Sequence, residues 1–167
     1  MKVELKTVSK DEKEILRNLL EKYDYEFSQW TNRDVNNLGL YGYDYLDYYW
    51  TEDNRHAFFI MADGKLAGFI MVNGYPETGE PTDYCLSEFF VMYKYRRMGI
   101  GSIAALKAFD LFHGKWQLKR HPHNFPSVHF WNKLILEYTQ GKYRLVESHP
   151  SAEYEDGTAG DVFFFEN

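Results

Sequence analysis

The sequence predicts a mixed α+β domain, in which helices flank a central, twisted, mixed sheet. Strand–helix–strand units in the second half require parallel neighbouring strands. A hairpin in the first half, centred on Asp63-Gly64, requires antiparallel ones. Hydrophobic residues make up 44% of the 167 residues, which suffices for the core of one domain. We therefore expect a single domain over residues 1–167.

Two local signals are clearest in the first half. Ser9 and Glu12 have the spacing of a capping box, and apolar residues at helical spacing follow them. Asp63-Gly64 predicts a type I′ turn, because Gly tolerates the positive φ that this turn requires. The elements expected here are a strand at 3–8, a helix at about 10–28, a short helix near 44–50, and strands at 57–62 and 66–72.

In the second half, helix ends are marked by particular residues. Gly114 is expected to cap the C-terminus of one helix. Asn124 is expected to cap the start of the next, with Pro126 in its first turn and Gly141 at its end. The elements expected here are a strand at 84–92, a helix at 102–113, a strand at 116–118, a helix from 124 to about 140, and strands at 143–146 and 162–165.

Composition excludes several classes of function. The net charge of −6 argues against a general nucleic-acid binder. The single cysteine, Cys85, can form neither an internal disulfide nor a multi-thiolate zinc site; we expect a buried, inert thiol, with a nucleophile as the alternative. His121 and His123 lack a third ligand at suitable spacing, so no metal site is expected.

The start of the chain has no apolar signal-peptide region, and no apolar run has the length of a membrane helix. We therefore expect a cytoplasmic protein without a membrane partner.

A basic, glycine-containing turn lies between the apolar strand and the helix that follows it. Its sequence is Arg96-Arg97-Met98-Gly99-Ile100-Gly101. A helix start presents unpaired N–H groups and the positive end of the macrodipole. The glycines remove side chains that would keep an anion from those amides, and the arginines add charge. The turn therefore predicts a diphosphate site.

Other phosphate-binding loops fit this turn less well. A Rossmann loop has a third Gly near residue 104, where this chain has an Ala that the pattern tolerates, but it also requires an acid near residue 119, which is Lys. A Walker A loop needs Gly-Lys-Ser/Thr, which is absent. Two interpretations stay open beside the diphosphate site: a turn that binds nothing, and a nucleotide-binding module of another kind.

These residues resemble a known family. Arg96-x-x-Gly99-x-Gly101 resembles the acetyl-CoA pyrophosphate loop of the GNAT N-acetyltransferase superfamily, and 86–91 resembles its fourth strand. Asn124, with Trp131 seven residues later, resembles its second cofactor motif. The order of elements fits over nearly all of the chain, and the longer pattern resembles a group of uncharacterised predicted acetyltransferases. The resemblance implies the GNAT acyl-CoA N-acyltransferase fold.

The resemblance also implies acetyl-CoA as cosubstrate. Main-chain groups of 89–91 would pair with the pantetheine arm as an added half-strand. Amides of 97–102 would hold the pyrophosphate, and Asn124 would bond to the pantetheine. Arg96, Arg97 or Lys133 would meet the adenosine phosphates, the alternative being solvated side chains. The implied cofactor-binding residues are Phe89, Phe90, Val91, Arg96, Arg97, Met98, Gly99, Ile100, Gly101, Ser102, Asn124 and Trp131.

The implied chemistry is attack of a neutral amine on a thioester, which requires a base. Glu88 is our candidate because burial in an apolar strand raises the pKa of a carboxyl; a solvent-facing Glu is the alternative. A strand amide near Val91 would stabilise the oxyanion. Many family members place a Tyr acid where this chain has Trp131, whose indole is no proton source at neutral pH.

The acceptor side is less defined. Tyrosines between 41 and 50 are placed where the family often builds its acceptor cleft, with ordinary packing as the alternative. Asp44 and Asp47 would attract a cationic substrate. We therefore expect an N-acetyltransferase that moves the acetyl group of acetyl-CoA to an unidentified primary amine. The alternative is a non-catalytic acyl-CoA-binding or regulatory module. The resemblance also suggests a homodimer.

Overall fold

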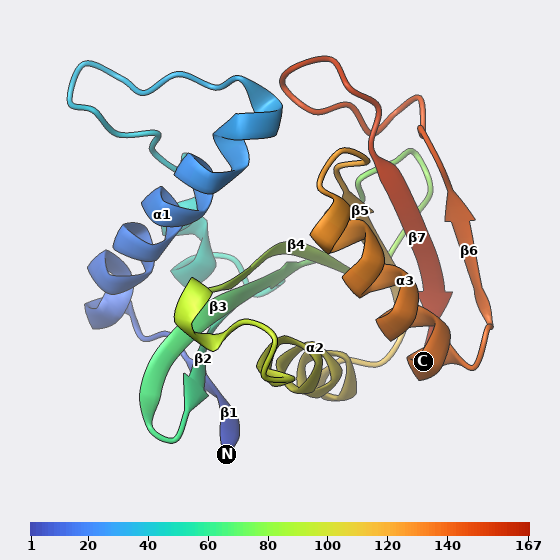
Figure 1. Ribbon diagram of the computed structural model, residues 1–167, viewed down its shortest axis with the longest axis horizontal. Coiled ribbons are helices and arrows are strands. Elements are labelled where there is room, and N and C mark those ends of the chain that lie inside the picture. The colour runs from blue at the N-terminus through green and yellow to red at the C-terminus, as the bar shows by residue number, and fades with distance from the viewer.

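A seven-stranded twisted sheet runs through the computed structural model, which describes residues 1–167 (Figure 1). The strand order is β1-β2-β3-β4-β5-β7-β6. The strands are β1 (Val3–Thr7), β2 (Arg55–Ala62), β3 (Lys65–Asn73), β4 (Tyr84–Val91), β5 (Lys115–Arg120), β6 (Tyr143–Val146) and β7 (Asp161–Glu166). The α-helices are α1 (Lys13–Thr31), α2 (Ile100–Leu111) and α3 (Phe125–Thr139). Short 3-10 helices are η1 (Lys10–Glu12), η2 (Leu46–Trp50) and η3 (Tyr93–Tyr95).

The sheet is mixed, as predicted. β4 and β5 are parallel, and all other neighbouring strands are antiparallel. The β2–β3 hairpin turns at Asp63 and Gly64, whose φ values of 47° and 75° confirm the predicted type I′ geometry. None of the helices combines the length and apolarity needed to cross a membrane.

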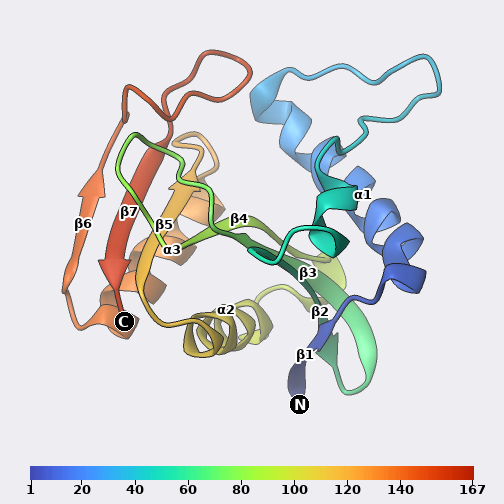
Figure 2. The same cartoon turned by 180° about the vertical axis from the view of Figure 1, so that it is seen from behind.

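Helices cover both faces of the sheet, and each face has its own core. On one face, α2 and α3 pack over a cluster of 20 buried residues that includes Ile100, Phe109 and Trp131. On the other, α1 and η2 pack over a cluster of 11 that includes Leu16 and Leu46. Seen from behind, β5, β7 and β6 stand apart from β1, β2 and β3 (Figure 2). β4 is the strand that belongs to both halves.

Three helix boundaries differ from the prediction. The capping-box residues begin the 3-10 helix η1, in which Glu12 Oε2 accepts from the Ser9 amide at 3.1 Å, and α1 starts only at Lys13. α2 begins two residues earlier than expected, at Ile100. The prediction of Gly114 as its C-cap is wrong: the helix ends at Leu111 with an extended Phe112, and the Gly114 amide donates to Asn167 Oδ1.

The parallel pair β4–β5 is short. Only Tyr84↔Trp116 and Cys85↔Gln117 are paired, after which the two strands diverge (Figures 1 and 2). From Leu86 onward, the edge of β4 that faces β5 has no strand beside it. The second half of β4 therefore offers main-chain groups at an open notch between the two halves of the sheet.

Candidate active site

A β-bulge places two consecutive polar residues of β4 on the α1 face of the sheet. The β3–β4 register shifts between Met71 and Val72, so that Ser87 is an extra residue. Ser87 Oγ lies 3.1 Å from the hydroxyl of Tyr49. Glu88 Oε1 accepts from the hydroxyl of Tyr43 at 3.3 Å. Without the bulge, side-chain alternation would send one of these two side chains to the opposite face.

Glu88 is half-buried in the notch, beside aromatic side chains. Burial raises its pKa from 4.5 to about 8, and the negative charge of Asp24 adds to this effect. The hydroxyls of Tyr23 and Tyr43 oppose it. A carboxyl with a pKa near 8 takes up a proton from an amine more readily than an ordinary Glu does. The geometry therefore supports Glu88 as the candidate base.

The free edge of β4 is formed by alternate residues. The Met92 amide donates to Ala67 O, near the start of β3. Since main-chain groups alternate in direction along an antiparallel strand, those of Val91 and Phe89 are directed at the notch and those of Phe90 at β3. The ring of Phe90 packs in the α1-side core. Of the three strand residues predicted to pair with pantetheine, Phe89 and Val91 thus have main-chain groups at the open edge.

The turn before α2 exposes a run of main-chain amides. Arg97 and Gly99 have φ values of 63° and 77°, and these left-handed conformations fold the chain back on itself. The amides from Arg97 to Ser102 make no hydrogen bond within the protein; the first helical bond runs from Ile103 N to Gly99 O. Donors at a helix N-terminus attract anions, so these free amides have the arrangement that the predicted diphosphate site requires.

Side chains of the turn have separate roles. Ile100 is fully buried in the α2-side core and anchors the start of the helix. Met98 is exposed, and Ser102 is half-buried. A side chain at Gly101 would contact the rings of Phe89 and Phe130 at 3.5 Å, so these rings border the space beside the turn.

Arg96 joins the turn to α1 and to the end of β4. Its guanidinium binds Glu26 through two hydrogen bonds of 2.7 and 2.6 Å. Its Nε donates to Val91 O at 2.6 Å, and the group lies over the ring of Tyr93 at 4.1 Å. These partners occupy the side chain that we predicted to meet the cofactor phosphates. Arg97 makes no ion pair.

Asn124, the N-cap of α3, and Trp131, within α3, were also predicted to meet the cofactor. Asn124 Oδ1 accepts from the Ser127 amide at 3.3 Å, which confirms the predicted N-cap and leaves the amide group of its side chain unbonded. Trp131 is 5% exposed and packs edge-on against Phe89, with ring centroids 5.1 Å apart. Its indole forms part of the wall between α3 and β4.

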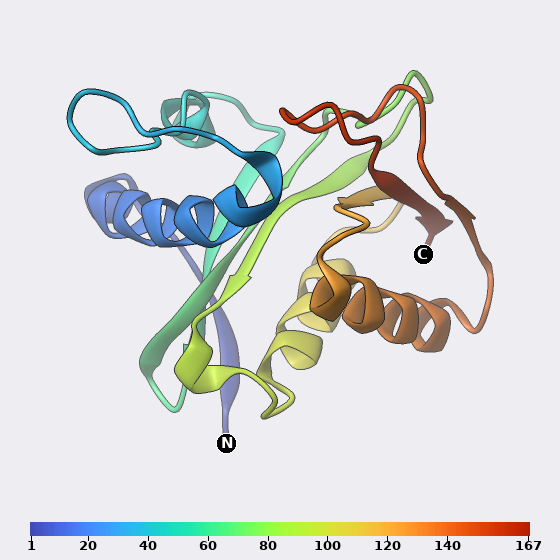
Figure 3. The same cartoon turned by 45° about the horizontal axis from the view of Figure 1, so that its top comes forward.

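An aromatic bridge of Phe27, Trp30, His121 and Tyr154 closes the notch at one end. Phe27 and Trp30 are in the last turns of α1, His121 follows β5, and Tyr154 belongs to the loop between β6 and β7. Phe27 lies 5.9 Å from Tyr154 and 6.4 Å from His121, between ring centroids. In Figure 3 the end of α1 and the β6–β7 loop approach each other above the diverging strands.

The tyrosines of the aromatic segment lie in different places. Tyr43 reaches Glu88, but Tyr45 and Tyr48 are exposed and stand around Arg55 on the outer side of η2. Asp47 forms an ion pair with Lys13. Tyr23, Asp24 and Tyr154 carry no sign of Glu88 in the sequence, since only tertiary structure brings them near it.

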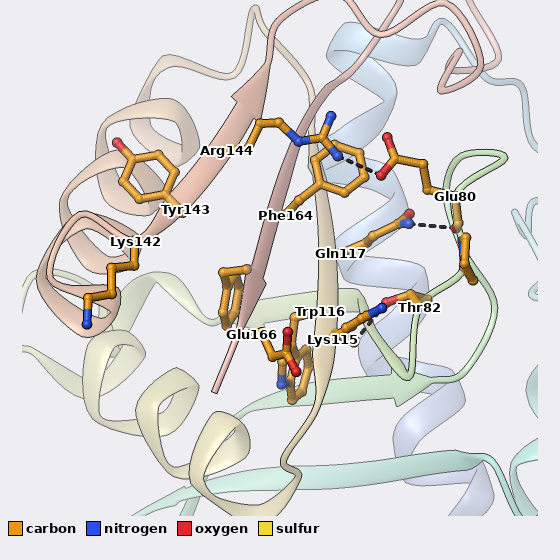
Figure 4. A pocket seen from close by; sticks show the side chains of 12 residues that line it. Glu80, Thr82, Lys115, Trp116, Gln117, Lys142, Tyr143, Arg144, Phe164 and Glu166 are labelled. Carbon is orange, nitrogen blue, oxygen red and sulfur yellow. Dashed lines mark hydrogen bonds and ion pairs between the residues drawn. The ribbon is translucent and has the colours of Figure 1, made fainter.

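A separate hollow of about 500 Å³ lies at the far end of the sheet (Figure 4). Gln117, Phe164 and Arg144 lie in one register row on its floor. An ion pair of 2.6 Å between Arg144 and Glu80 crosses it.

Cys85 is buried, as predicted, and burial raises the pKa of its thiol well above the ordinary value, which removes the nucleophile alternative.

Three features characterise the site: parallel strands that diverge, unbonded amides at a helix start and the half-buried carboxyl of Glu88. The family model described as "Acetyltransferase (GNAT) family" matches residues 15–134. The chain therefore belongs to the GNAT acetyltransferase family, as the resemblance suggested, and is an acetyltransferase.

Solved structures share this fold. An acetyltransferase from Thermus thermophilus is 18% identical with a TM-score of 0.70, covering 100% of this chain and 98% of that one. The PaiA N-acetyltransferase of Thermoplasma acidophilum, in complex with coenzyme A, is 13% identical with a TM-score of 0.63 and 100% coverage of both chains. Arabidopsis thaliana NAA60, in complex with acetyl-CoA, is 11% identical with a TM-score of 0.65, covering 99% and 98%. Among curated proteins, none matches the sequence.

Proposed function

We propose that this protein transfers the acetyl group of acetyl-CoA to a primary amine, by direct attack of the amine on the thioester. The observation that carries the proposal is the run of unbonded amides from Arg97 to Ser102 beside the open edge of β4. Proteins of the same fold hold coenzyme A and acetyl-CoA, which supports this choice of donor.

The donor fits the notch group by group. The amides of 97–102 suit a diphosphate, because each supplies an N–H without a competing partner. Phe89 offers its main-chain N–H and carbonyl, and Val91 its N–H, to the amide-containing pantetheine arm; the Val91 carbonyl is already bound by Arg96 Nε. The unbonded side-chain amide of Asn124 is free to donate to the same arm. The thioester would then reach the level of Glu88, where β4 leaves β5.

Proton transfer at Glu88 starts the reaction. The carboxylate takes a proton from the acceptor ammonium, and the amine lone pair attacks the thioester carbon. The main-chain N–H of Val91, directed at the notch, would stabilise the oxyanion. The C–S bond then breaks, coenzyme A leaves as a thiolate, and the acetylated nitrogen releases its extra proton to solvent to give the neutral amide. Trp131 supplies no proton, so this thiolate leaves unprotonated or takes its proton from solvent.

Calorimetric titration tests donor binding. Acetyl-CoA should bind selectively, with NAD and ATP as controls. An amine panel with wild type and Glu88→Gln then tests transfer, which the variant should lose by a factor of about 10²–10⁴. Preference for NAD or ATP would contradict the proposal.

One observation favours a second candidate, a non-catalytic acyl-CoA-binding module. Trp131 stands where a general acid is usual, and its indole is packed into the core. Tight acetyl-CoA binding without transfer to any amine would support this candidate.

We further propose a cytoplasmic location, because that is where an acetyl-CoA-dependent enzyme finds its donor. The homodimer stays a prediction that sedimentation equilibrium can test.

A further inference from the structure

A carboxylate on α1 holds the loop of residues 32–45 where it returns from the end of that helix. Glu21 lies in the middle of α1. Its Oε2 accepts from the Tyr41 amide and its Oε1 from the Gly42 amide, each at 2.9 Å. In Figure 1 this loop leaves the end of α1 and comes back alongside the helix. Hydrogen bonds to an ionised group are the strong ones, so Glu21 fixes the returning backbone with both of its oxygens.

Gly42 gives the loop the shape that Glu21 binds. Its φ of +73° is left-handed, and nothing lies within 4 Å of the position that a Cβ would take. A left-handed residue in a turn lets successive amides point at one anion. The Tyr41 and Gly42 amides thus form a small anion-binding concavity, and its anion is a side chain of the same protein.

Arg33 holds the same two residues by their carbonyl groups. Its Nη2 donates to Tyr41 O at 2.7 Å and to Gly42 O at 3.1 Å. All the main-chain polar groups of Tyr41 and Gly42 are therefore bound by two side chains of α1 and of the residues just after it. We call these four hydrogen bonds the clamp. The next residue of the chain, Tyr43, starts from a fixed backbone.

Tyr43 connects the clamp to the candidate base. Its ring packs against the α1-side core, and its hydroxyl donates to Glu88 Oε1 at 3.3 Å. A hydroxyl that donates to a carboxylate stabilises the ionised form and limits the rotation of the group. The other ionisable groups near Glu88 come from α1, η2, β4 and two loops: Tyr23, Asp24, Tyr49, Glu77, Cys85 and Tyr154.

We infer that Glu21 is a positioning residue for the candidate base: by holding the backbone of Tyr41 and Gly42, it places the Tyr43 hydroxyl on the Glu88 carboxyl. The inference rests on the proposed function and adds to it a residue that acts through Tyr43. Without the clamp the loop loses its two bonds to a charged group, and the hydroxyl leaves Glu88. The carboxylate is then less stable, and a smaller fraction of the protein holds an active base below about pH 8.

Matched variants test this chain of contacts. Tyr43→Phe removes the hydroxyl and keeps the ring, and Glu21→Gln removes the charge and keeps the shape. Tyr25→Phe and Glu14→Gln make the same changes at exposed positions of α1. For each protein, kcat/KM for one amine is measured from pH 6 to pH 9.5, and thermal unfolding checks that the variant is folded. The ionisation of the amine cancels when each variant is divided into wild type at the same pH.

At pH 6, wild type should exceed Tyr43→Phe in kcat/KM by about 3- to 10-fold, the range of one hydrogen bond. The ratio should approach 1 at pH 9.5, where the carboxyl is largely ionised in both proteins. Glu21→Gln should show the same pH dependence, and the double variant should lose no more than Tyr43→Phe alone, because Glu21 acts through that hydroxyl. Tyr25→Phe and Glu14→Gln should match wild type.

A second pair of variants strains the clamp without removing a charge. Gly42→Ala forces a side chain into φ +73°, and Gly39→Ala does the same at φ +72° in the same loop but outside the clamp; neither Cβ would meet a neighbour. Gly42→Ala should therefore reproduce the pH-dependent loss of Glu21→Gln, and Gly39→Ala should not. Equal behaviour of the two alanine variants would contradict the role of the clamp.

The ionisation of Glu88 is also followed without any reaction, by carbon-13 NMR of protein labelled at glutamate. Glu88→Gln identifies the signal, and Asp24, whose pKa is raised by burial to about 7, is not labelled. The Glu88 signal should titrate at higher pH in Tyr43→Phe and in Glu21→Gln than in wild type. This measurement decides the inference even if wild type transfers no acetyl group, an outcome that would contradict only the proposed function.

Three results would overturn the inference. The first is a ratio of wild type to Glu21→Gln that is the same at every pH, which marks a structural loss and leaves the proposed function intact. The second is a double variant that loses the product of both single effects, since Glu21 would then act apart from Tyr43. The third is a Glu88 titration that is unchanged in Glu21→Gln.

Discussion

The ionised Glu88 carboxylate should lower the free energy of unfolding, and Glu88→Gln should remove this effect. The carboxyl is half-buried, and its pKa is raised from 4.5 in the unfolded chain to about 8 in the folded protein. Between these values the folded state holds a proton that the unfolded state has lost. Stability linked to this group is therefore fully present below about pH 4.5 and is lost as the pH rises toward 8.

The size of the effect follows from linkage. Each pH unit in this window lowers the free energy of unfolding by at most ~1.4 kcal/mol, since the folded and unfolded states differ by one bound proton. Glu88 keeps some exposure to solvent, so we expect a total of about 2–4 kcal/mol across the window. Glu88→Gln has no charge to bury and keeps the shape, so its stability relative to wild type should grow with pH by that amount.

Urea denaturation of both proteins from pH 5 to pH 9 measures this difference. Glu137→Gln, on the exposed side of α3, is the matched control and should follow wild type at every pH. Acetyl transfer by wild type should rise over the same interval, with an apparent pKa of about 8, because only the carboxylate accepts a proton. A stability difference between Glu88→Gln and wild type that is constant with pH would refute the assignment of a buried base.

Further predictions concern the backbone and the Arg96 contacts. Gly99→Ala forces a side chain into φ +77°, which should cost about 1–2 kcal/mol and weaken acetyl-CoA binding in calorimetry, whereas Gly79→Ala, which meets no neighbour, should change neither. Gly68→Ala would place a Cβ 1.9 Å from Phe90 O, so thermal unfolding should show a loss of about 3 kcal/mol or more, and retained stability would contradict the close β3–β4 approach. Glu26→Gln should cost about 1–2 kcal/mol and raise the KM for acetyl-CoA several-fold at little change in kcat, because Arg96 then loses its charged partner; an unchanged KM would show that this pair does not position the turn.

Local sequence signals predicted most of the framework. The Asp63-Gly64 turn, the Asn124 cap and the α3 helix were readable because each depends on residues within a few positions of one another. The diphosphate turn was readable for the same reason: its glycines, its arginines and the helix start are contiguous. Gly114 was misread, since its amide is bound by Asn167 from the other end of the chain.

The side chains around the candidate base were decided by tertiary structure. Glu88 was chosen from its apolar strand, but the sequence does not show the bulge that turns it toward α1, nor its neighbours Tyr23 and Asp24. Arg96 was assigned to phosphate because a lone arginine carries no sign of its partner, and Glu26 lies on a helix 70 residues earlier.

The sequence by itself therefore determined the order of elements, the mixed sheet and the diphosphate turn, all of which follow from periodicity, capping and turn chemistry along a short stretch of chain. Tertiary structure decided how many residues of β4 and β5 pair, which amides remain unbonded and which carboxylates lie beside the notch. Those features depend on the packing of α1, β4 and the β6–β7 loop, and Phe27 meets Tyr154 only once the two halves of the sheet have folded together.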